Sequence, residues 1–60
     1  NNGEILFDKA VNLAYLGKTP ACLESLKMSI RISNEFKIKA KNSSSFDGLE
    51  KNHQFLEIIR

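Results

Sequence analysis

The sequence has little of what usually stabilises or localises a small domain. It contains one cysteine and one histidine, so an internal disulfide and a four-ligand zinc site are both excluded. No run approaches the roughly 20 apolar residues that span a membrane. No basic stretch followed by an apolar one marks a signal peptide. These absences exclude a disulfide-rich secreted module and a zinc finger.

Length and charge narrow the possibilities further. A chain of 60 residues makes one domain at most. The net charge of +2 is too small to indicate a nucleic-acid partner by itself. The sequence opens with Asn1 and not with methionine, so we expect a piece of a longer chain. An intracellular, cytoplasmic location is favoured.

Helix signals dominate the sequence, and strand signals are nearly absent. A first helix is expected over 4–16, ended by Gly17. Thr19 as the N-cap and Pro20 as the first residue predict a second helix over 20–32. A connection of about three residues forces two helices into an antiparallel hairpin. The sequence therefore predicts an all-α fold.

The expected first helix is apolar on two faces. Asn2 or Gly3 is its expected cap. Its apolar residues form two series with helical spacing, which are Leu6, Ala10 and Leu13, and Phe7, Val11 and Ala14. A helix of this kind is usually packed between neighbours. The second helix has one stripe, formed by Cys22, Leu23, Leu26, Ser29 and Ile30.

Residues 34–60 predict short helices that close the domain. Three elements are expected there, which are a helix over 35–41, a turn over 46–49 and a last helix over 53–59. Their expected caps are the pair Ser33–Asn34, then Ser45 and Asn52.

The segment from Leu16 to Ile30 resembles the turn and second helix of a tetratricopeptide repeat. That family has a glycine between its helices, then a small residue, a large apolar residue and another small residue. Gly17, Cys22, Leu26 and Ser29 stand at these places. Small residues let two antiparallel helices approach, and the large one fills the gap between them.

The rest of the chain resembles the end of tetratricopeptide proteins, where a helix, an acidic turn and a last helix follow the final repeat. The matching segments are Asn34–Lys41, Ser43–Leu49 and Asn52–Ile59. Serines replace the acidic residues before Phe46. A gap-free alignment puts Lys9 where the family has a core leucine, so either Lys9 extends its charge to solvent or the register shifts.

The resemblance implies one TPR-like domain fragment over 1–60, a piece of an alpha-alpha superhelix. One degenerate repeat would cover 4–33 and a C-terminal cap 34–60. It implies a non-catalytic protein–protein interaction or scaffold module at the C-terminal end of a solenoid. Repeats cannot bury their faces alone. Upstream repeats of the parent chain, a protein or peptide partner, or a second copy in a homodimer should therefore cover one face.

In the resembled family the first helices line a concave partner surface. On the gap-free alignment the residues facing it are Glu4, Phe7, Val11, Ala14 and Tyr15. As in that family, the C-terminal cap over 34–60, which we call the tail, is expected to pack chiefly on the second helix. Phe7, Val11 and Tyr15 would then lack cover, so we expect self-association or partner docking through the first helix.

An alternative function is a small helical nucleic-acid-binding domain that uses residues 27–41. This segment contains five basic residues and only one acidic residue, Glu35. The only aromatic residue in the segment is Phe36, which is expected in the core, so base stacking would have no exposed platform.

No catalytic constellation is evident. Cys22 is either a reactive thiol or a small packing residue, and its place in an apolar stripe favours packing. His53 has no partner at a recognisable catalytic spacing. We therefore expect no enzymatic activity, no cofactor and no metal.

Overall fold

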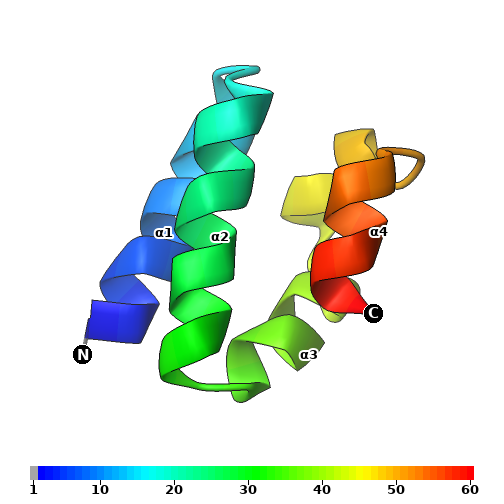
Figure 1. Ribbon diagram of the computed structural model, residues 1–60. Helices are drawn as coiled ribbons and strands as arrows, with labels where there is room; N and C mark the ends of the chain where they lie inside the picture. Colours follow the sequence, from blue (N-terminus) through cyan, green and yellow to red (C-terminus); the bar gives the residue numbers. More distant parts are fainter. Residues whose placement is uncertain (1) are drawn as a thin grey trace.

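The computed structural model describes residues 2–60, which form helices and no strand (Figure 1). The elements are α1 (Asn2–Tyr15), α2 (Thr19–Ile32), α3 (Glu35–Asn42), the 3₁₀ helix η1 (Ser44–Leu49) and α4 (His53–Ile59). α1 and α2 pack as an antiparallel hairpin, and the rest of the chain turns back beside it (Figure 1). The predicted all-α hairpin with short C-terminal helices is confirmed.

The turn between α1 and α2 depends on a glycine in the left-handed region. Gly17 has a φ of 73°, which side chains rarely adopt. The Lys18 N–H donates to the Leu13 carbonyl at 3.0 Å, and the Gly17 N–H donates to the Ala14 carbonyl at 3.1 Å. These two bonds form a Schellman motif, which satisfies carbonyls at the end of α1. Gly17 therefore ends the first helix, as predicted.

The same motif changes how α2 begins. Thr19 was predicted as the N-cap, but it is the first helical residue. Lys18 occupies the cap position, because the chain leaves the Schellman turn directly into the helix, and its carbonyl accepts the Cys22 N–H at 2.9 Å. Pro20 lies in the first turn, where its missing N–H leaves no helical bond unmade.

Of the predicted caps in the tail, Asn52 is confirmed, Ser45 is wrong, and Asn34 stands at the cap position of α3 without a side-chain cap bond. Asn52 accepts the Phe55 N–H at 2.9 Å through Oδ1, as predicted for the start of α4. Ser43, and not Ser45, caps η1, because the Ser45 N–H donates to the Ser43 hydroxyl oxygen at 3.2 Å. Asn34 has helical backbone angles and makes no side-chain cap bond.

The start of α1 also differs from the prediction. The helix already includes Asn2 and Gly3, so neither residue caps it. Asn1 lies outside the described residues.

Small side chains bring α1 and α2 close together. The small residues Ala10 and Cys22 are fully buried, as is the larger Leu26. The Ser29 hydroxyl donates a buried 2.7 Å hydrogen bond to the Gly3 carbonyl across the helix pair. Ser25 is buried as well, although the predicted stripe did not include it, whereas Ile30 is only half-buried.

Four phenylalanines join the hairpin to the tail. Phe7 stacks on Phe36 with 5.6 Å between ring centroids, and it forms a T-shaped pair with Phe46 at 5.8 Å. Phe55 lies 5.7 Å beyond Phe46. The prediction that Phe7 lacks cover is wrong, since it is 8% exposed. The physical reason is that α3 and η1 pack on α1, while α3 and α4 pack on α2, so Phe7 becomes the partner of two rings in the tail. The expectation that the tail lies chiefly on the second helix is therefore wrong.

Candidate interaction surfaces

The structure separates the five residues that sequence predicted on one partner surface. Phe7 belongs to the core, and Val11 and Ala14 are half-buried and pack against it. Only Glu4 and Tyr15 are exposed, Tyr15 to 83%. The tail therefore covers Phe7, and the partner contact through the other four residues stays a prediction.

An apolar surface remains on the other side of the hairpin, which we call the uncovered hairpin face. It consists of Leu6, Leu13, Ala21, Met28 and Ile32. Met28 is 45% exposed and Ile32 is 52% exposed, while Leu6 and Leu13 are half-buried. The spacing of seven and four residues places these side chains on one side of each helix. Exposed Lys9 lies one helical turn from both Leu6 and Leu13, at the edge of this face.

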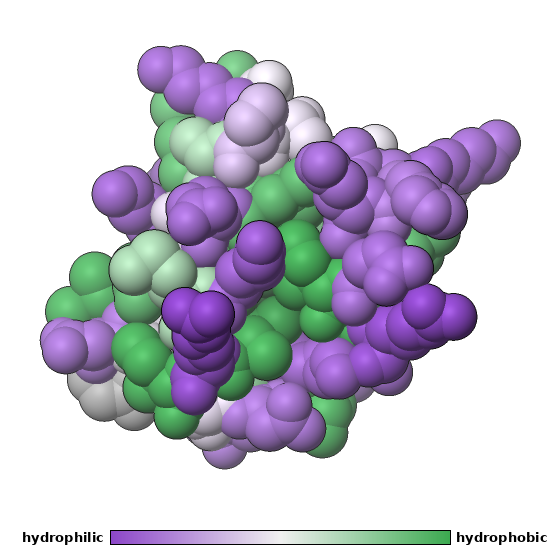
Figure 2. All heavy atoms as spheres, in the orientation of Figure 1, coloured by the Kyte–Doolittle hydropathy of each residue, from purple (hydrophilic) through white to green (hydrophobic). Residues whose placement is uncertain are grey.

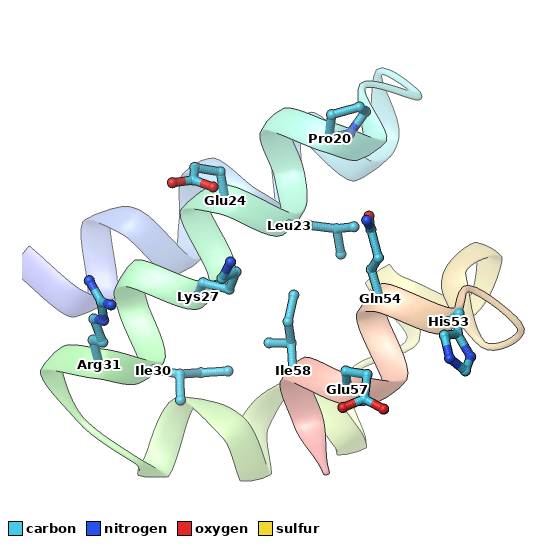
Figure 3. A pocket seen from close by; sticks show the side chains of 10 residues that line it. All are labelled: Pro20, Leu23, Glu24, Lys27, Ile30, Arg31, His53, Gln54, Glu57 and Ile58. Atoms are coloured by element: carbon cyan, nitrogen blue, oxygen red, sulfur yellow. The ribbon is translucent and has the colours of Figure 1, made fainter.

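A second surface is a groove between α2 and α4 with a volume of about 620 Å³, which we call the α2–α4 groove. Leu23, Ile30 and Ile58 point into it in the close view (Figure 3). Figure 2 shows the same region as an apolar strip between α2 and α4 with hydrophilic side chains on both sides. The groove has an apolar floor between polar walls.

Two polar side chains lie directly over this groove. Lys27 extends from α2 toward the space, and Gln54 extends from α4 toward Leu23 (Figure 3). Within residues 2–60, Lys27 makes no ion pair. Glu57 also lines the groove, but its carboxylate forms a 3.0 Å ion pair with the guanidinium of Arg60. Glu24 and Arg31 line the groove as well, and like Lys27 they make no ion pair within residues 2–60. The unpaired cations of the groove therefore exceed its unpaired carboxylates by one.

Sequence reasoning missed this groove because it depends on how α4 docks. Leu23 and Ile30 were expected in the buried stripe of the second helix, and Ile58 among the apolar residues of the last one. Their spacing shows that each helix is amphipathic. It does not show that the apolar side chains of α2 and α4 leave a groove between them. In the structure Ile30 and Ile58 remain half-buried.

The basic segment over 27–41 is divided between α2 and α3. Its aromatic residue, Phe36, is 1% exposed, so it offers no stacking platform, as expected. The ammonium of Lys39 lies 5.5 Å from the ring centroids of both Phe7 and Phe36. This cation therefore covers the aromatic core from outside.

Cys22 is fully buried between the helices. Burial disfavours the thiolate and raises the pKa of the Cys22 thiol. A reactive thiol needs the opposite conditions, which are exposure and a lowered pKa. The position therefore fits a packing residue. His53 is exposed at the start of α4.

Residues 2–60 hold no group of three histidine, cysteine or carboxylate side chains placed to bind a metal ion. No helix in that range has both the length and the apolar character to cross a membrane. Comparison of the chain with protein-family models, with curated proteins and with solved structures found no match.

Proposed function

We propose that the chain is a non-catalytic protein-interaction module and forms the C-terminal end of a tetratricopeptide-type helical array. The observation that carries this proposal is the asymmetry of the hairpin. On one side the tail covers it with Phe36, Phe46 and Phe55, which are all buried. On the other side the uncovered hairpin face stays apolar. A terminal unit of a stacked array has this arrangement, with one capped side and one side for a neighbour.

Local geometry supports the proposed family. Gly17 makes the tight turn, and Cys22 and Ser29 are the small buried residues that let α1 and α2 approach. The Ser29 bond to the first turn of α1 fixes their relative register. These are the positions on which the sequence resemblance depends.

The proposed partner of the uncovered hairpin face is a preceding antiparallel hairpin. Full burial of a Met or Ile side chain contributes about 1.5–3 kcal/mol. Met28 and Ile32 are each about half exposed, so covering both would contribute roughly 2 kcal/mol. That is a large fraction of the stability of so small a domain.

The proposal is tested by fusing one designed tetratricopeptide hairpin in front of the chain. We expect the free energy of unfolding of the fused C-terminal unit to rise by about 2 kcal/mol over the chain alone. Met28→Glu should remove this gain, because it places a charge in the stacked interface. Ile38→Glu is the matched control, since Ile38 is 58% exposed on α3. Equal stability of the fused and unfused chains would contradict the proposal.

A further inference from the structure

We infer that the α2–α4 groove accepts the outer side of α1 from a second copy of this chain, so that copies associate head to tail. This inference rests on the proposed interaction function but uses different residues from the uncovered hairpin face. Its occupant is identified by three features of the chain, which are apolar side chains, charge and length.

The outer side of α1 carries two exposed apolar side chains with a carboxylate between them. We call it the outer α1 stripe, formed by Ile5, Asp8, Asn12 and Leu16. Ile5 is 65% exposed and Leu16 is 68% exposed, so both can enter an apolar groove. Asp8 is exposed between them and makes no ion pair within residues 2–60.

The charges of the two surfaces are complementary. Lys27 lines the groove without an ion pair (Figure 3), and with Arg31 against Glu24 the unpaired lining charges sum to one positive charge. Asp8 is an exposed carboxylate of the outer α1 stripe. Ion pairs at the rim of an interface contribute modestly to affinity but set orientation and exclude wrong partners. An Asp8–Lys27 pair would orient the incoming helix in the groove.

The lengths of the two surfaces also agree. Pro20 and Arg31 mark the extent of the groove along α2, and eleven residue steps of about 1.5 Å make it about 16 Å long. Ile5 and Leu16 are also eleven steps apart, so the outer α1 stripe is about 16 Å long. One helix can therefore fill the groove from end to end.

The contact joins different surfaces of the two copies. α1 and α4 lie on opposite sides of α2 (Figure 1), so the outer α1 stripe of one chain cannot reach its own groove. A heterologous contact of this kind repeats and gives rings or open chains of copies. A single helix in a groove buries less area than the ~1,200 Å² of a stable interface, so the association is weak and reversible.

The test uses charge reversal at each end of the proposed pair. We expect sedimentation equilibrium of the 60-residue chain to show a mass that rises past that of a dimer toward ~1 mM. Lys27→Glu alone and Asp8→Lys alone should each weaken association by about tenfold, because each opposes like charges. An equimolar mixture of the two variants should associate as the original chain does, since every groove then finds a complementary helix.

Two control variants have the same changes in net charge outside both surfaces. They are Lys51→Glu and Glu50→Lys, both at exposed positions, and they should leave association unchanged. A monomer at ~1 mM overturns the inference. So does association that the reversals at Lys27 and Asp8 do not alter. Neither result affects the fused-hairpin test, which depends on Met28 and Ile32.

Discussion

Truncation of Phe7 separates the observed packing from the one that sequence predicts. Phe7 is 8% exposed and contacts Phe36 and Phe46. Phe→Ala at such a core position costs about 3–5 kcal/mol in unfolding free energy. Domains have roughly 0.05–0.15 kcal/mol of stability per residue, which gives about 3–9 kcal/mol here. Phe7→Ala should therefore remove about a third or more of the total stability.

Urea denaturation followed by far-ultraviolet circular dichroism measures this loss. Tyr15→Ala is the matched control, because Tyr15 is on the same helix and 83% exposed. It should change the unfolding free energy by less than about 0.5 kcal/mol. Phe7→Leu keeps apolar volume but loses two ring contacts, so we expect a loss of about 1–3 kcal/mol. A loss below ~1 kcal/mol for Phe7→Ala would refute the packing of the tail on α1.

Three further perturbations have defined outcomes. Ser29→Ala removes the buried bond to Gly3 and should cost about 1–3 kcal/mol by urea denaturation; no change would mean that water replaces the hydroxyl. Asn52→Ala removes the cap on the Phe55 N–H and should cost about 0.5–2 kcal/mol, with Asn42→Ala as the control. Burial raises the Cys22 thiol pKa, so its contribution is complete below the unfolded pKa and falls as pH rises through the folded one. Unfolding free energy measured against pH should therefore decline more steeply in alkali for the original chain than for Cys22→Ala, and parallel curves would contradict a buried thiol.

Local chemistry made much of the hairpin predictable. Gly17 ended the first helix as expected, because only a residue without a Cβ adopts its φ easily. Cys22, Leu26 and Ser29 were buried as the helical period required. Asn52 capped the last helix, since a side chain near its own backbone needs no tertiary information.

The misplaced features depend on tertiary structure. Thr19 is a good cap by type, but the Schellman turn places Lys18 there instead. Phe7 has the same periodicity whether a tail or a partner covers it, so sequence does not decide between the two. The α2–α4 groove is hidden from sequence for the same reason. The pattern that contains Ile30 and Ile58 fits a closed contact between the two helices as well as an open groove.

The central claim is that the tail covers one side of the hairpin and leaves the other for a neighbour. Nuclear magnetic resonance with a soluble paramagnetic agent measures this directly, since exposed protons relax faster. The account predicts strong relaxation of the Met28 methyl, protection of the Phe7 ring, and nuclear Overhauser contacts from Phe7 to Phe46. Protection of Met28 together with exposure of Phe7 would contradict it, because the tail would then lie on the opposite face.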